Sequence, residues 1–237
     1  MEILPGLHWV ERIWDTKVYI LVESGRLVVV DAAMPGRAAA VWRHLESMGY
    51  PPEAVDEIWL THGDIDHMGS VAALKAGSGA KVVAHRADAP LVDGRADREL
   101  GPLALNGMYQ CLFNWAIRRV FRYQPISVDR SVEDGDDLGG WQVVHVPGHT
   151  AGSVCFYNPA QKIVITGDAL NHRPWRRRWR QHLGAPPAAF TPDMAQAHAS
   201  IRKIAALDFE VCCFGHGPPL MDNARQRVQT LADSLAV

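Results

Sequence analysis

The sequence lacks a long hydrophobic run, although 48% of its 237 residues are hydrophobic. No apolar stretch approaches the roughly 20 residues that a membrane-spanning helix needs, so we expect no membrane span. The first residues, MEILPGL, lack the basic flank and apolar core of a signal peptide. The four cysteines lie far apart except for the adjacent pair Cys212 and Cys213, and they are predicted to be reduced and mostly buried. Together these absences predict a cytoplasmic protein.

The sequence also lacks a large net charge, since its basic and acidic residues nearly balance and leave only −2. No overall field would therefore attract nucleic acid or a membrane surface. The sequence contains no glycine-rich phosphate loop and no dinucleotide-binding fingerprint. It also contains no low-complexity segment or linker that would separate two domains. We therefore expect one domain over residues 1–237, of a size that can bury a substantial core.

Strand and helix patterns alternate along most of the chain, which is typical of an α/β protein. Two of the apolar strands end in an aspartate, at Asp31 and Asp168, and this similarity suggests two related halves. Strands are predicted over 17–23, 26–31, 58–60, 81–84, 141–146, 153–157, 162–166 and 210–214, and helices over 37–48, 70–75, 194–206 and from 222 onward.

The segment 98–129 interrupts this alternation with apolar residues at helical spacing between Met108 and Val120. It is predicted to be a helical insertion between the two halves. Its apolar face is expected to pack on the sheets near the mouth of the site. The alternative is a hydrophobic lid over the site that includes Trp115.

Four potential metal ligands occur within six residues, in the motif His62-Gly-Asp64-Ile-Asp66-His67. They follow a predicted strand and precede a helix. Carboxylates and imidazoles placed so close together favour a cation among them, because a helix start could satisfy only one carboxylate. The alternative interpretation is a polar loop with chance histidines.

Three further candidates lie beside glycines at predicted strand ends: His149, Asp168 and His216. Glycine lets the backbone turn tightly and present a neighbouring side chain into a cleft. Any one of them alone would be an ordinary turn residue. Their occurrence together, after the motif at 62–67, predicts a shared metal centre.

The order of these motifs resembles the metallo-β-lactamase superfamily over about residues 3–220. The resemblance implies a four-layer αββα sandwich with a metal cleft at one edge. It also implies that Asp31 supports the site from behind by holding the motif loop, although a simple strand-end turn is the alternative for this residue. By the same resemblance, His62, Asp64 and His149 would bind a first metal, Asp66, His67 and His216 a second, and Asp168 would bridge both.

Asp64 departs from the family pattern, which usually has a histidine there. We consider three outcomes: Asp64 binds the first metal directly, binds it through water, or leaves that site weak. A carboxylate makes the centre less positive and raises the pKa of bound water. It also shifts the preference from zinc toward manganese or iron. We expect two divalent metal ions, with zinc as the first choice and Mn or Fe as alternatives.

The expected activity is metal-dependent hydrolysis, in which a metal-bridging hydroxide attacks an ester-type bond of a small molecule. The bond could belong to a lactone, thioester, carboxylic ester or phosphoester. Asp66, or a metal-bound water, is the candidate proton shuttle, and Asp168 is the candidate bridge. The alternatives are an iron or diiron oxidoreductase, which Asp64 keeps open, a nuclease-type phosphodiesterase, and a binding protein on a degenerate site.

Substrate contacts are expected beside the site, in the arginine- and tryptophan-rich segment that follows Asp168. Such a segment could attract an anionic or aromatic substrate, or could be a solvated loop. Nucleic acid is not favoured, since no extra binding domain is evident, and a homodimer remains an open possibility. The candidate residues are Asn171, His172, Arg173 and Trp175, with Trp115 from the insertion.

Overall fold

A computed structural model describes residues 1–23, 25–102, 107–121, 123–174 and 181–235. The chain divides into two compact units, each formed from two stretches of sequence. Unit 1 comprises Met1–Arg98 and Cys111–Ser131, and unit 2 comprises Glu99–Gln110 and Val132–Val237. Each unit is described by itself, and the single domain expected from the sequence stays a prediction.

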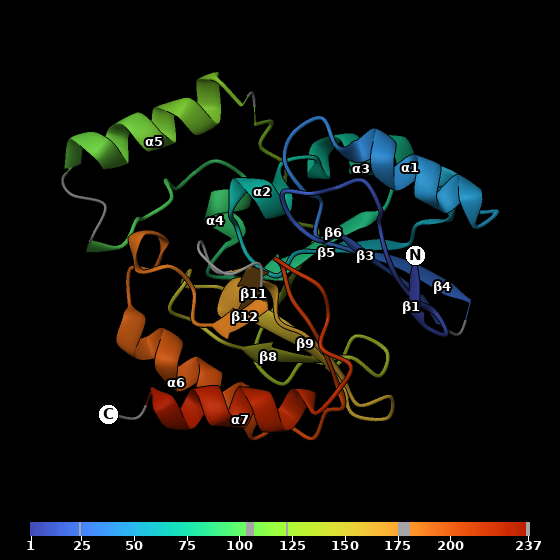
Figure 1. Cartoon of the computed structure of the whole chain (residues 1–237). Helices are drawn as coiled ribbons and strands as arrows, with labels where there is room; N and C mark the ends of the chain where they lie inside the picture. Colours follow the sequence, from blue (N-terminus) through green and yellow to red (C-terminus); the bar gives the residue numbers. More distant parts are fainter. Residues whose placement is uncertain (24, 103–106, 122, 175–180, 236–237) are drawn as a thin grey trace. The chain divides into compact units, whose positions relative to one another are not determined.

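Unit 1 is built on a mixed sheet whose strands follow one another in chain order (Figure 1). The first four strands pair antiparallel, whereas β4, β5 and β6 pair in parallel. Parallel neighbours require crossover connections, and helices provide them here. The strands are β1 (Glu2–Leu4), β2 (Leu7–Trp9), β3 (Tyr19–Glu23), β4 (Arg26–Val30), β5 (Glu57–Trp59), β6 (Lys81–His85) and β7 (Arg130–Val132).

Helices α1 (Ala38–Ser47) and α3 (Val71–Ser78) lie on one face of this sheet (Figure 1). Their apolar positions recur at helical spacing, so Val41, Leu45 and Leu74 all point into one core. That core also contains alternate residues of the central strands, such as Val29 and Ile58. The shorter elements of unit 1 are η1 (Pro52–Ala54), α2 (Ile65–Met68) and α4 (Ala89–Val92).

Unit 2 contains a four-stranded sheet in the order β13-β10-β9-β8, and α6 and α7 pack on it. Buried residues of both helices, including Ile201 and Val228, share a core with Val164 and Cys212 of the sheet. The elements are β8 (Gln142–His145), β9 (Val154–Asn158), β10 (Ile163–Ile165), η3 (Gly167–Ala169), β11 (Asn171–Pro174), β12 (Gln181–Gly184), η4 (Ala188–Phe190), α6 (Met194–Ala205), β13 (Val211–Cys213) and α7 (Ala224–Ser234).

The predicted insertion contains a helix, α5 (Gly107–Arg119), so its helical character is confirmed. The expectation that its apolar face is buried is wrong for three side chains. Met108, Leu112 and Trp115 are 76%, 58% and 56% exposed. Asn114 turns inward and is buried, and Phe113 packs against the core of unit 1.

Two hairpins were not predicted from the sequence. β1 pairs with β2 at the N-terminus, and β11 pairs with β12 around the arginine-rich segment. Their strands are short and lack a clear alternation of apolar and polar residues, which explains why the pattern did not reveal them. Three cysteines are buried as expected, whereas Cys111 is exposed. No helix among the described residues is long and apolar enough to cross a membrane.

Candidate metal centre

In unit 1 the motif at 62–67 occupies the turn between β5 and the short helix α2. Asp64 is the residue before the first turn of that helix, and its carbonyl oxygen accepts hydrogen bonds from the amides of His67 and Met68 at 2.9 Å. The turn therefore brings the whole motif together in one compact loop. The rings of His62 and His67 lie side by side, with centroids 4.1 Å apart.

Asp31 fastens this loop to the end of β4. Its backbone is left-handed, with φ of 64°, a conformation that aspartate tolerates better than most residues. Its carboxylate accepts hydrogen bonds from the amide and hydroxyl of Thr61 and, at 2.8 Å, from Nδ1 of His67. The last bond fixes the His67 tautomer and leaves Nε2 as the nitrogen available to a metal, a common arrangement behind a metal-binding histidine.

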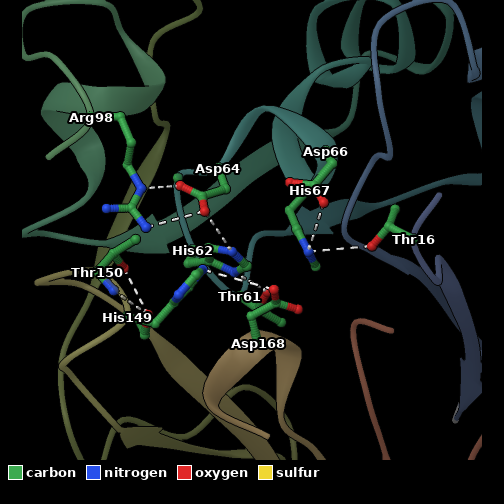
Figure 2. A network of polar contacts seen from close by, with 12 residues as sticks. Thr16, Thr61, His62, Asp64, Asp66, His67, Arg98, His149, Thr150 and Asp168 are labelled. Carbon is green, nitrogen blue, oxygen red and sulfur yellow. Dashed lines mark hydrogen bonds and ion pairs between the residues drawn. The ribbon is translucent and has the colours of Figure 1, made fainter. Parts of the chain in front are cut away.

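Other contacts fix the remaining motif side chains. Nδ1 of His62 lies 3.0 Å from the Thr61 hydroxyl, so its Nε2 faces Asp64, whose carboxylate is 3.7 Å away. Nε2 of His67 lies 3.3 Å from the hydroxyl of Thr16 and 3.9 Å from the carboxylate of Asp66 (Figure 2). The two histidines thus turn their Nε2 atoms toward the carboxylates of the motif.

Two residues outside the motif contribute to the loop and were not identified from the sequence. Asp88 is buried, and its carboxylate accepts a hydrogen bond from the Gly63 amide at 2.8 Å. Arg98 is also buried and binds the Asp64 carboxylate with two nitrogens, Nε to Oδ1 and Nη2 to Oδ2 (Figure 2). Both lie more than twenty residues downstream of the motif, and neither sits in a recognisable pattern.

In unit 2 the three other candidates lie close together. Nε2 of His149 is 3.8 Å and Nε2 of His216 is 3.3 Å from the same oxygen, Oδ2 of Asp168. All three side chains are buried. Nδ1 of His149 faces the hydroxyl of Thr191 at 3.4 Å, which orients Nε2 toward Asp168.

Glycines allow the close approach that this cluster requires. Gly148 has φ of 128°, and a Cβ there would lie 2.3 Å from the amide nitrogen of Ala197. Gly217 has φ of 96°, and a Cβ there would lie 1.6 Å from the carbonyl oxygen of His172. Only glycine fits at either position, next to His149 in one case and His216 in the other.

The donors in unit 2 fit a divalent metal ion. Zinc binds imidazole nitrogen and carboxylate oxygen at about 2 Å, so tetrahedral ligand atoms lie roughly 3.3 Å apart. The separations of 3.3 and 3.8 Å around Asp168 are close to that value and are longer than ordinary hydrogen bonds. The candidate ligands in the chain are His62, Asp64, Asp66 and His67 in unit 1 and His149, Asp168 and His216 in unit 2.

The expected substrate contacts occupy different environments. Asn171 and His172 are buried on β11, where Nδ1 of His172 donates a hydrogen bond to the carbonyl of Pro218 at 2.8 Å. Burial lowers the pKa of His172. Arg173 is exposed, and Trp175 lies outside the described residues. The substrate roles of these residues stay predictions.

The chain is similar to known proteins over most of its length. A family model described as the metallo-beta-lactamase superfamily matches residues 13–216. The chain is 29% identical to a probable metallo-hydrolase, YflN, of Bacillus subtilis (strain 168), over 99% of this chain and 93% of that protein. It is 30% identical to a hydroxyacylglutathione hydrolase of Ruegeria pomeroyi, over 94% of this chain and 70% of that protein.

A solved structure, that of TTHA1623 in a di-iron-bound form, resembles the chain with a TM-score of 0.66 and 25% identity. The match covers 95% of this chain and 97% of that one. The predicted α/β class and metallo-β-lactamase fold are therefore confirmed, and the relatives identify a metal-dependent hydrolase. The chain belongs to the metallo-β-lactamase superfamily.

Proposed function

We propose that this metallo-hydrolase cleaves an ester-type bond in a small molecule with two divalent metal ions. His62, Asp64 and His149 would hold the first ion, and Asp66, His67 and His216 the second, with Asp168 as the shared ligand. The observation that carries the proposal is the cluster in unit 2, where two imidazole nitrogens face one buried carboxylate oxygen at 3.3 and 3.8 Å. Zinc is the first choice, and the carboxylate of Asp64 keeps manganese and iron as alternatives.

Bound divalent ions would supply the electrophile that polarises the substrate and would acidify the attacking water. The side chains of the chain would then position the reactants and move protons. Asp66 is the candidate proton shuttle because its side chain is 30% exposed and can exchange a proton with solvent or substrate. Asp31 would hold His67 in the metal-binding tautomer through the 2.8 Å bond to Nδ1.

A thioester is the leading member of the proposed substrate class. The support is the similarity to a hydroxyacylglutathione hydrolase, whose name describes cleavage of an acyl-glutathione. Lactones, carboxylic esters and phosphoesters remain in the class because the same metal chemistry serves each of them.

The test combines metal analysis with a substrate panel. Protein purified from unsupplemented medium would be analysed for zinc, manganese and iron, and assayed against a thioester, a lactone, a carboxylic ester, a phosphodiester and nitrocefin. We expect bound metal and fastest turnover of the thioester. Iron with oxygen uptake and no hydrolysis would instead support the oxidoreductase alternative, and a preference for the phosphodiester would support a nuclease.

Asp168→Ala is the matched variant for this test. It should release metal and lower kcat/KM by at least about 100-fold, because it removes the carboxylate that faces both histidines of unit 2. Asp208→Ala in the same unit is the control, since the Asp208 side chain is 62% exposed and forms only surface ion pairs with lysine and arginine. Full activity of Asp168→Ala would contradict the proposed centre.

A further inference from the structure

The carboxylate of Asp64 has an unusual partner for a candidate metal ligand. As the residue before α2, Asp64 could cap the helix, yet its side chain makes no such hydrogen bond. Its two oxygens are bound instead by Nε and Nη2 of Arg98, in the two-pronged geometry that is strongest between arginine and a carboxylate. The same Oδ2 lies 3.7 Å from Nε2 of His62.

Arg98 is fixed in this position. Its side chain is only 6% exposed, and its carbonyl oxygen accepts a hydrogen bond from the side chain of Asn114 on α5 at 3.1 Å. A guanidinium stays protonated at any ordinary pH, so its charge cannot be removed to make room for a cation. Turning it away from Asp64 would break a buried, two-pronged ion pair, which is strongly unfavourable.

Two residues of the motif, His67 and Asp64, therefore have neighbours of opposite charge. Behind His67 stands the carboxylate of Asp31, which makes the imidazole a better ligand. Against Asp64 stands the guanidinium of Arg98, which occupies both carboxylate oxygens and repels a divalent ion at short range.

We propose that Arg98 is an internal counter-ion that weakens the metal position served by His62 and Asp64. The chain then holds one divalent ion firmly in the other position and fills the position at His62 and Asp64 only at higher metal concentration. This inference rests on the proposed metal-dependent function and adds to it a cationic residue that sets the metal stoichiometry.

Metal titration of the full chain tests the proposal without an activity assay. Metal-free protein would be titrated with zinc by calorimetry, and bound zinc would be measured by elemental analysis after dialysis at fixed free zinc. For the wild type we expect one tight ion and a second bound at least about tenfold more weakly, the scale on which neighbours of metal ligands change affinity. Two ions of equal affinity would overturn the proposal.

Arg98→Met removes the charge and should raise the affinity for the more weakly bound ion at least about tenfold, so that two ions remain after the same dialysis. Arg98→Lys retains a positive charge, so the affinity for the more weakly bound ion should stay low. The control is Arg95→Met, which removes a neighbouring arginine whose ion pair with Asp93 is on the surface, and whose side chain is 72% exposed. Arg95→Met should bind zinc like the wild type.

If Arg98→Met does not fold, Arg98→Gln replaces it, since a neutral amide can still donate a hydrogen bond to Asp64. A folded neutral variant with the wild-type titration would overturn the role of Arg98. Failure of the proposed function has a different signature, because the wild type would then bind no metal at all. The two proposals can therefore fail separately.

Discussion

At the scale of the residue, the candidate centre depends on side chains that hold the ligands as much as on the ligands themselves. Asp31 binds both Thr61 and His67, and Asp88 binds the amide of Gly63. Each of these carboxylates is almost fully buried, so its hydrogen bonds are not replaced by water. The geometry of the motif loop should therefore be sensitive to isosteric changes behind it.

Asp31→Asn tests this dependence. It preserves the shape but removes the charge that accepts the His67 Nδ1 proton, so we expect a 10- to 100-fold loss of metal affinity, measured by competition with a chromogenic chelator. Asp56→Asn is the control, because the Asp56 carboxylate also accepts a hydrogen bond from an amide, that of Leu27 at 2.8 Å, but lies before β5 and outside the motif loop. Equal affinity in Asp31→Asn and wild type would count against a supporting role for Asp31.

Two partly buried histidines away from the site, His8 and His44, predict a dependence of stability on pH. Burial lowers the pKa of His44, and also that of His8, whose ring lies 6.1 Å away. Both histidines therefore protonate more readily in the unfolded chain, whose histidine pKa is about 6.5. Their contribution to stability is present above that pH and is lost as the pH falls below it.

Urea unfolding of His44→Gln at pH 7 and pH 5 measures this effect. The wild type should lose stability between the two values, and the variant should lose less, because one group that binds a proton on unfolding is gone. If the variant loses as much unfolding free energy as the wild type between pH 7 and pH 5, His44 does not contribute to the pH dependence.

At the scale of the element, packing decides which helices stabilise the fold. α1 buries Leu45 completely in the core of unit 1, whereas α5 exposes Met108, Leu112 and Trp115. The two helices are both amphipathic in sequence, yet α5 leaves these three apolar side chains exposed. Substitutions on them should therefore affect different properties of the protein.

Leu45→Ala should lower the free energy of unfolding by about 2–5 kcal/mol, because it leaves a cavity where a side chain is fully buried. Arg43→Ala on the exposed side of the same helix should change it by less than about 0.5 kcal/mol. Chemical denaturation measures both values, and a small effect of Leu45→Ala would contradict the packing of α1.

Trp115→Ala should leave the unfolding free energy within about 0.5 kcal/mol of the wild type, since the side chain is 56% exposed. If α5 contributes a substrate contact, as the sequence suggested, this variant should raise KM and leave kcat nearly unchanged. Steady-state kinetics with the preferred substrate separates the two parameters, and an unaltered KM would remove Trp115 from the substrate contacts.

At the scale of the whole molecule, metal and folding should be coupled. If the proposed ligands of both units share the metal ions, metal binds only when both units are folded, and bound metal then stabilises the native chain. A free metal concentration of 100 times the dissociation constant adds about 2.7 kcal/mol. Calorimetry should show one cooperative transition for the loaded protein, as expected of a single domain, and a lower Tm after chelation. Two separate transitions would contradict the single-domain prediction.

Much of this architecture could be predicted from local patterns. The strands that end near Asp31 and His62 are short runs of β-branched and apolar residues, and α1 and α6 show clear helical spacing. The hairpin β11–β12 could not be predicted, because its pairing joins segments without alternation on either side of the arginine-rich stretch. The exposure of Trp115 could not be predicted either, since an amphipathic pattern does not show whether another part of the fold covers the apolar face of the helix.

The sequence alone determined the family and the candidate ligands, because histidines, aspartates and glycines recur in a characteristic order from His62 to His216. Tertiary structure alone decided which side chains stand behind those ligands. Arg98 meets Asp64 across 34 residues of sequence and Asp31 meets His67 across 36. No local pattern encodes such contacts, since they arise only when separate strands and loops pack side by side. The charge around the motif is therefore a property of the fold.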